Sequence, residues 1–419
     1  MMAAVAAAKA VGVTPEIVQQ TLESFPGLEH RLEFVREKDG VRYFNDSKGT
    51  NVGAVEKSLA SFSQPVILIA GGVDNVRIAN ASGSLDLTIA DGANQAVIGL
   101  NDAGAGDNGI YIETSGTASL TLTLDGVDFL GSRGDLLHIA AQGSSSQDLT
   151  IANNSFHNAH PSTGPGGGGV FLTGGGVGSN INVDYVVENN SFRGADGNAL
   201  TALFTPAAGT IRGHIEGNVV GLNDGVAGFE GSAGGGDGIF VGIDKLAGAG
   251  SATHSVNILD NEVYDVAFGL GGIHLRSNGG GAGNGAILEA VVNGNIVDES
   301  GAFAALYTMV GGSAFSGDFA QMGLELNNNL FDNGDAPFGG HAIYLDQISF
   351  DAHYYLPGYA GSSEGEWNGG TASDDLDAFL AAKGNVMVNG GFPTFAGGVD
   401  AGFVTGVTGD AFVLPIWFP

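Results

Sequence analysis

The sequence predicts a mostly β fold, a right-handed parallel β-helix solenoid of about eight or more coils, preceded by a small truncated α/β segment. Three observations predict it. An asparagine followed by a short apolar run recurs along the chain, and a second apolar triplet recurs between the copies. Composition changes sharply near Asp74, and no copy of the asparagine pattern precedes residue 75. The predicted domains are therefore residues 1–74 and residues 75–419.

The asparagine pattern is clearest as Asn-Asn-Ser-Phe at 153–156 and again at 189–192. Its second asparagine, or the counterpart in looser copies, stands at positions 154, 190, 218, 261, 295, 329 and 385. At the corner of a coil, an asparagine turns the chain and its amide can bond to the coil above. We expect Phe156, Phe192 and Phe331, which follow the corner, to point into the core.

The second pattern is a short apolar strand, often led by glycine. It occurs at 109–112, 135–139, 169–172, 198–200, 238–241, 272–275, 305–307 and 341–345. A third, less marked strand is expected at positions such as Ser119–Leu124 and Met322–Leu326. Three short strands in a period above twenty residues are typical of a parallel β-helix. A long insertion near 348–383 contains a predicted helix over 373–382, capped by Ser373.

Charge and glycine separate the two domains. Residues 1–74 hold 7 Lys/Arg, 9 Asp/Glu and 7 Gly, whereas residues 75–419 hold 7 Lys/Arg, 36 Asp/Glu and 66 Gly. So few basic residues argue against nucleic-acid partners. No apolar run reaches the ~18 residues of a membrane span, and the first residues lack the basic region of a signal peptide. Cysteine is absent, so disulfides are excluded.

Residues 1–74 read as alternating helices and strands, which is typical of an α/β unit. We expect helices over 3–11, from Pro15 to about Phe25, and over 52–62. A strand pair is expected at 32–36 and 41–45, and a last strand at 65–70.

Three motifs in this segment carry a resemblance: Phe-Pro-Gly-Leu-Glu-His-Arg-Leu-Glu at 25–33, Phe-Asn-Asp-Ser-Lys-Gly-Thr-Asn at 44–51 and Ile-Ala-Gly-Gly-Val-Asp at 69–74. They resemble the Mur ligase family of ATP-dependent amide-bond-forming enzymes, specifically the end of the central domain and the first half of the C-terminal domain. The resemblance implies that Arg31 and Asp46 contact the nucleotide. It also implies that Lys48 and Thr50 lie near the incoming amino acid, in a cytoplasmic enzyme.

The segment departs from that family in two ways. Asn75 stands where the family has a lysine that helps to hold the substrate carboxylate, and the 419 residues contain no G-x-x-x-x-G-K-[ST] phosphate loop. We therefore expect an inactive ligase remnant that caps the first coil, with ATP as a cofactor only if the segment were functional. The sequence leaves open whether the junction near Asp74 is a natural fusion, a misassembled reading frame or an engineered chimera.

Residues 75–419 resemble the pectin-lyase-like β-helix superfamily, which includes bacterial surface passenger domains. The resemblance implies a shape and an extracellular or cell-surface location. Polygalacturonases of this superfamily carry Gly-His-Gly and Arg-Ile-Lys motifs, but this chain has Gly-His-Ala at 340–342 and Arg-Ile-Ala at 77–79.

Strand alternation predicts one candidate binding face. If the first and third residues of each triplet point inward, the middle ones point outward and stack ~4.8 Å apart. These middle residues are Tyr111, Phe171, Phe240, His274, Tyr307 and Tyr344, with Arg276, Asp237 and Asp346 as polar neighbours. A column of flat rings suits a polysaccharide or cell-surface glycan. The alternative is that long loops cover the rings.

Catalytic residues are harder to assign. Asp237, Asp244, Asp265 and Asp346 are candidates for the carboxylate pair of a glycoside hydrolase. The segment Ala233–Val241 resembles a single calcium-binding Gly-Asp repeat, so Ca²⁺ is compatible, but no histidine cluster has metal-ligand spacing. The predicted function is a non-catalytic surface or secreted scaffold that binds carbohydrate or acts as an adhesin. The alternatives are a β-helix polysaccharide-degrading enzyme and an ATP-dependent ligase, and nothing indicates the oligomeric state.

Overall fold

The computed structural model divides the chain into two compact units, Met1–Val66 and Ile67–Pro419. It describes residues 5, 8–24, 31–38, 41–45, 58, 62, 68–70, 76–90, 96–98, 108–158, 167–225, 230–232, 235–245, 251–279, 285–312, 318–333, 340–349, 351–359, 374–388, 399–401 and 407–408.

The first unit contains helix α2 (Pro15–Ser24) and the antiparallel strands β1 (Glu33–Lys38) and β2 (Val41–Asn45). Pro15 begins α2 as expected, because proline fits the first helical position, where its missing N–H is not needed. Phe34 and Phe44 pack edge to face across the strand pair, with ring centroids 5.7 Å apart. Within the predicted helix over 3–11 the described residues 5 and 8–10 are helical, whereas only residues 58 and 62 of the predicted helix over 52–62 are described.

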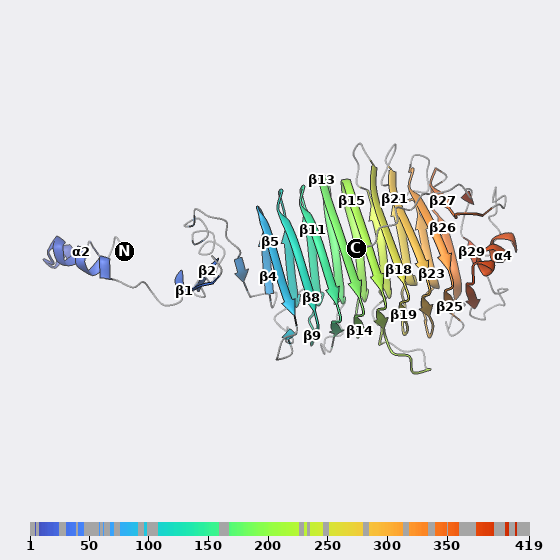
Figure 1. Cartoon of the computed structure of the whole chain (residues 1–419), viewed down its shortest axis with the longest axis horizontal. Coiled ribbons are helices and arrows are strands. Elements are labelled where there is room, and N and C mark those ends of the chain that lie inside the picture. Colours follow the sequence, from blue (N-terminus) through green and yellow to red (C-terminus); the bar gives the residue numbers. More distant parts are fainter. Residues whose placement is uncertain are drawn as a thin grey trace. The chain divides into compact units, whose positions relative to one another are not determined.

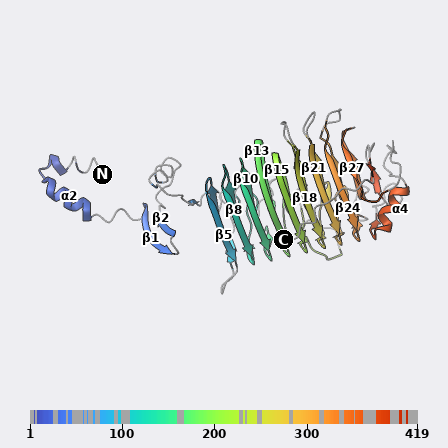
Figure 2. The same ribbon diagram turned by 45° about the horizontal axis from the view of Figure 1, so that its top comes forward.

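The second unit is mostly β, and its strands form two long sheets of 19 and 9 strands. Figures 1 and 2 show these strands side by side in sequence order. Within the larger sheet, a first run consists of β4 (Val76–Asn80), β7 (Ile110–Thr114), β10 (Leu137–Gln142), β13 (Val170–Glu188), β15 (Leu200–Glu216), β17 (Ile239–Asp244), β20 (Gly271–Asn278), β23 (Ala304–Val310), β26 (His341–Gln347) and β29 (Val399–Ala401).

A second run of the same sheet passes through the later halves of β13 and β15. It consists otherwise of β5 (Ser84–Ala90), β8 (Ser119–Asp125), β11 (Ser146–Ala152), β18 (Ser251–Leu259), β21 (Gly285–Asn293), β24 (Gln321–Asn327), β27 (His353–Tyr355) and β30 (Val407–Thr408). The 9-stranded sheet contains β6 (Ala96–Ile98), β9 (Val127–Phe129), β12 (Ser155–His157), β14 (Ser191–Arg193), β16 (Val219–Val220), β19 (Glu262–Val263), β22 (Ile296–Val297), β25 (Leu330–Asp332) and β28 (Val386–Val388).

The prediction of a closed right-handed β-helix solenoid is wrong. It requires three separate short strands in each coil, but β13 and β15 continue for 19 and 17 residues through a predicted corner. Gly175 and Gly176 adopt φ of 119° and 113°, so the chain bends there without leaving the sheet. The pairing of β13 with β15 shifts register between Gly176 and Asn180 and then resumes. Two expected faces thereby join into one long parallel sheet.

Successive repeats pair in parallel and in register, which stacks like residues into columns. One such column of the first run lies in the core and is at most 1% exposed: Ile110, Leu137, Val170, Leu200, Ile239, Ile273, Leu306 and Ile343. Burial of such a side chain contributes roughly 1.5–3 kcal/mol. Phe156, Phe192 and Phe331 are buried as predicted, and the rings of Phe156 and Phe192 stack at 5.1 Å.

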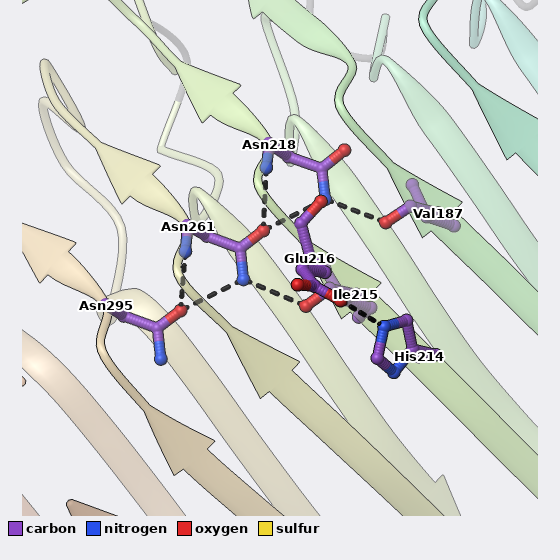
Figure 3. A network of polar contacts seen from close by, with 7 residues as sticks. All are labelled: Val187, His214, Ile215, Glu216, Asn218, Asn261 and Asn295. Carbon is purple, nitrogen blue, oxygen red and sulfur yellow. Dashed lines mark hydrogen bonds and ion pairs between the residues drawn. The ribbon is translucent and has the colours of Figure 1, made fainter. Parts of the chain in front are cut away.

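The predicted asparagine ladder is present, and Figure 3 shows three of its members. Asn218 donates from its backbone N and its Nδ2 to Oδ1 of Asn261, at 3.0 and 2.9 Å. Asn261 Nδ2 then donates to Oδ1 of Asn295 and to the carbonyl oxygen of Ile215. The same pattern links the seven buried residues Asn154, Asn190, Asn218, Asn261, Asn295, Asn329 and Asn385.

The residue before each ladder position, rather than the ladder asparagine itself, turns the chain. These seven residues all have positive φ: Asn153, Asn189, Gly217, Asp260, Gly294, Asn328 and Gly384. Glycine, asparagine and aspartate tolerate this left-handed conformation best, which explains the doubled Asn-Asn of the motif. At the last position, Asn385 Nδ2 donates to the carbonyl oxygen of Leu380 in helix α4 (Asp374–Ala382), so this helix ends the ladder.

The polar side chains of Tyr185 and His254 are buried in the core of the second unit. Tyr185 Oη lies 2.8 Å from Nε2 of His254, and Nδ1 of His254 lies 3.1 Å from the carbonyl oxygen of Gly242. A carbonyl can only accept, so Nδ1 carries the proton and Nε2 accepts from the tyrosine. Gly213 on β15 is the Cα partner of Tyr185, and β15 lies next to β18, the strand that carries His254. A Cβ added at Gly213 would overlap the tyrosine ring. Glycine is therefore required for this contact.

Strand β3 (Leu68–Ala70) pairs antiparallel with β4. Its residues belong to the stretch that resembles the Mur ligases. The pairing occupies the edge of β4 that would otherwise be free to pair.

Candidate functional site

The register of the first run places the predicted rings in one column. Successive Cα partners in this column are Tyr111, His138, Phe171, Thr201, Phe240, His274, Tyr307 and Tyr344. We call these eight residues the aromatic column. His138 and Thr201 were not among the predicted binding residues. Thr201 carries no ring, so it divides the column into three rings on one side and four on the other.

Ring contacts follow the column within each group. Centroids lie 5.0 Å apart for Tyr111 and His138, and 4.7 Å apart for His138 and Phe171. In the second group Phe240 stacks on His274 at 4.4 Å, and Tyr307 is parallel to Tyr344 at 5.8 Å. These are ordinary separations for interacting aromatic pairs.

Burial differs along the column. Phe240, His274 and Tyr307 are only 7%, 4% and 7% exposed, whereas Tyr111, Phe171 and Tyr344 are half-buried. The three central rings thus agree with the alternative that they are packed beneath other parts of the chain. An external ligand has access to the ends of the column rather than to its centre.

Exposed apolar residues extend the end that contains Tyr344. Phe303 is 42% exposed, and its ring lies 4.9 Å from Tyr344 and 4.6 Å from His341. Leu270 and Phe268 are 47% and 64% exposed, and Ala304 N donates to the carbonyl oxygen of Leu270. We call Leu270, Phe303 and Tyr344 the apolar platform.

The platform was not predicted, but the repeats contain a signal for it. Leu270 and Phe303 each stand four residues before a member of the column. In five of the six other repeats that position is glycine, at Gly134, Gly167, Gly197, Gly236 and Gly340, and in the first repeat it is Asp107. Two large apolar residues in a position that is elsewhere glycine or aspartate indicate a local specialisation.

A second polar ladder, also not predicted, runs along the corner before the column. Asn108 Oδ1 accepts from the backbone N of Asp135, and Asn198 Oδ1 accepts from the backbone N of Asp237. The carboxylates of Asp135 and Asp237 accept in turn from Gly168 and Gly271 of the next repeats. Each oxygen thus satisfies a backbone donor of the repeat above.

The remaining atoms of this corner ladder hold members of the column. Asp135 Oδ2 lies 3.1 Å from Nδ1 of His138, and Asn198 Nδ2 donates to Oγ1 of Thr201. Asp237 Oδ2 lies 2.7 Å from Nδ1 of His274. Both carboxylate oxygens of Asp237 are therefore bound by the protein, which gives this residue a structural role.

The other polar candidates on this face are paired as well. Arg276 donates from Nε to Asp244 Oδ1 at 2.9 Å and from Nη2 to Oδ2, and its guanidinium lies 5.0 Å from the centre of the Phe240 ring. Tyr307 Oη donates to Asp346 Oδ2 at 2.7 Å. Burial raises the pKa of Asp346, and the hydrogen bond from Tyr307 opposes that shift.

The four predicted catalytic aspartates do not form a pair on neighbouring repeats. Asp237 and Asp244 flank the same strand, β17, and Asp346 lies on β26, three strands away. At ~4.8 Å per strand, that is about 14 Å between backbones, beyond the ~5–9.5 Å between carboxyl groups that hydrolysis needs. Asp265 belongs to another part of the fold, because it follows β19 and its Oδ2 accepts from the backbone N of Leu222.

The part of the chain that the structure describes holds no group of three or more histidine and acidic side chains able to bind a metal ion. No described helix is both long and apolar enough to cross a membrane. Of the predicted ligase residues, Arg31 is exposed, whereas Asp46, Lys48 and Thr50 lie outside the described residues.

No family model matches the chain, and no solved structure matches it at a significant level. The predicted resemblance to pectin-lyase-like and bacterial surface domains is therefore unsupported. Together with the two long sheets, this overturns the expectation of a surface adhesin built on a closed solenoid.

Curated relatives match over a short stretch. The chain is 59% identical over 71 residues to the UDP-N-acetylmuramoylalanine--D-glutamate ligase of Pelotomaculum thermopropionicum, which is 17% of this chain and 16% of the relative. The same enzyme of Caldicellulosiruptor saccharolyticus is 60% identical over 62 residues, and that of Geobacillus kaustophilus 52% over 75 residues. These alignments cover 15% and 18% of this chain, and 14% and 17% of the relatives. The chain thus spans about one sixth of the length of these relatives, and only its short N-terminal stretch resembles a Mur ligase.

Proposed function

We propose that residues 75–419 form a non-catalytic scaffold that binds a polysaccharide through the apolar platform. The observation that carries this proposal is the position of Leu270, Phe303 and Tyr344 at the accessible end of an in-register column of rings. Rings fixed on a rigid sheet lose little side-chain freedom when a ligand binds.

The chemistry of the platform supports a sugar ligand. A sugar ring has an apolar face that packs on a flat ring and hydroxyl groups around its rim that need hydrogen-bond partners. Phe303 and Tyr344 offer the apolar surface, and Asp346 lies two residues beyond Tyr344 on the same side of β26. Such a combination of apolar surface and few polar groups is typical of small-molecule sites.

The contacts and positions of the acidic residues support a non-catalytic role. Asp237 binds His274 and Gly271, Asp244 binds Arg276, and Asp346 lies three strands from both. Each of the first two carboxylates is already used to hold a neighbour. A hydrolase would need one carboxyl group free to donate a proton and a second within reach of the same bond.

An oligosaccharide array tests the proposal. Removal of the ring in Tyr344→Ala or Phe303→Ala is expected to weaken binding of the preferred glycan about tenfold, because the sugar face loses its stacking surface. Phe319→Ala is a matched control, since Phe319 is 46% exposed and lies outside the column. Equal binding by all three variants, or no binding of any glycan by the wild type, would contradict the proposal. Release of reducing sugar would favour the hydrolase instead.

The similarity of the N-terminal stretch to the ligases raises ATP-dependent ligation as a second candidate function. We infer that this stretch does not support ATP-dependent ligation within these 419 residues. The inference is supported by the absent phosphate loop and by Asn75 at the position of the family's lysine.

Isothermal titration of the full chain with Mg²⁺-ATP is expected to give no saturable heat. The informative comparison is Arg31→Ala with Arg36→Ala, because both arginines are exposed and only Arg31 falls within the ligase-like motif. Saturable heat that disappears in Arg31→Ala and persists in Arg36→Ala would show a working nucleotide site and overturn the inference.

A further inference from the structure

The charge balance around the platform distinguishes among glycan classes. Residues 75–419 contain 36 acidic but only 7 basic residues. On the face of the column, the guanidinium of Arg276 is already bound by both oxygens of Asp244. A polyuronate would have to bring its carboxylates to a surface of the same sign, and such juxtaposition is unfavourable.

Asp346 lacks a cationic partner among the residues that the structure describes. Its side-chain contact is with a neutral group, the hydroxyl of Tyr307, which donates to Oδ2. Tyr354 donates to the backbone carbonyl of Asp346 and so fixes the strand beneath it. The carboxylate is half-buried beside Tyr307 and next to the platform, where screening by water is weaker than on an open surface.

We propose that the ligand is a glycan whose sugars carry free ammonium groups, with one ammonium bound by Asp346 while the ring of the same or the adjacent sugar packs on Tyr344 and Phe303. This inference rests on the proposed carbohydrate-binding function and narrows it to one substrate class. A charged hydrogen bond is stronger than a neutral one, so the ammonium adds to the stacking of the ring.

Three defined pentasaccharides of similar size test the class. They are a β-1,4-linked glucosamine pentamer, its fully N-acetylated form and a galacturonate pentamer, each titrated into the full chain at pH 6. We expect the glucosamine pentamer to bind at least tenfold more tightly than either of the others. Its affinity should fall as NaCl rises from 50 to 500 mM, because salt screens the pairing of ammonium and carboxylate.

Asp346→Asn isolates the charge, because an asparagine oxygen can still accept from Tyr307. This variant is expected to bind the glucosamine pentamer about tenfold more weakly. The control Asp148→Asn removes the same charge from an exposed position on β11 and is expected to bind like the wild type. Equal loss in both variants would assign the effect to net charge and overturn the role of Asp346.

The outcomes separate this inference from the function on which it rests. Tighter binding of the N-acetylated or galacturonate pentamer, with sensitivity to Tyr344→Ala retained, would overturn the amino-sugar class and leave carbohydrate binding intact. If none of the three pentamers and no glycan of the wider array binds, both the amino-sugar inference and the carbohydrate-binding function are contradicted.

Discussion

Replacement of Asn261 by leucine is expected to lower the free energy of unfolding by about 4 kcal/mol. The leucine side chain has the same number of heavy atoms and the same branch point, so the loss comes from hydrogen bonds rather than from a cavity. The backbone N–H of Asn218 and the carbonyl of Ile215 lose their partner, and both lie inside the buried ladder. Unpaired buried groups of this kind cost roughly 1–3 kcal/mol each. Chemical denaturation of the full chain measures the change.

Asn257→Leu, four residues upstream on β18, is a matched control. Asn257 is half-buried and stands outside the ladder. We expect this substitution to cost less than about 1 kcal/mol, as is usual for residues away from buried networks. Similar losses for Asn257→Leu and Asn261→Leu would mean that the ladder does not contribute specifically to stability.

Acidification is expected to destabilise the fold through His254. Burial lowers the pKa of this histidine from 6.5 to about 4, although the hydrogen bond to the Gly242 carbonyl opposes the shift. The unfolded histidine therefore binds a proton at a higher pH than the folded one. The stability is fully present above pH 6.5 and is lost as the pH falls toward 4, by about 3 kcal/mol.

Urea denaturation at pH 7, 6, 5 and 4 measures this effect as the difference between the wild type and His254→Gln. The wild type should lose its advantage over the variant progressively, because glutamine does not titrate. His353→Gln, at a half-buried position on β27, is the control for replacing a histidine outside the core. A difference between wild type and His254→Gln that stays constant with pH would contradict the assignment.

The sequence predicted the ladder because its signal is local. The doubled asparagine combines a residue that tolerates positive φ with one whose amide reaches the next repeat, so Asn153 and Asn154 are recognisable without a structure. The column of rings was also predictable, since alternation along a strand and parallel register are enough to align Tyr307 with Tyr344.

The connection of the strands was not predictable in the same way. Separate short strands were expected in each period, yet Gly174–Gly176 bend the chain inside β13 and the ladder of hydrogen bonds resumes beyond them. The exposure of each ring could not be predicted from the sequence either, because it depends on which parts of the chain pack against the outer side of the sheet. Tyr307 is 7% exposed and Phe303 is 42% exposed, although both belong to the same repeat.

A crystal structure of the full chain with a bound glucosamine pentamer is the most direct test of the central claim. We expect a sugar ring packed against Phe303 and Tyr344, with an ammonium nitrogen within hydrogen-bonding distance of the Asp346 carboxylate. Sugar bound elsewhere, such as on the Ser/Thr-rich outward side of β5, β8 and β11, with the platform left empty, would contradict it.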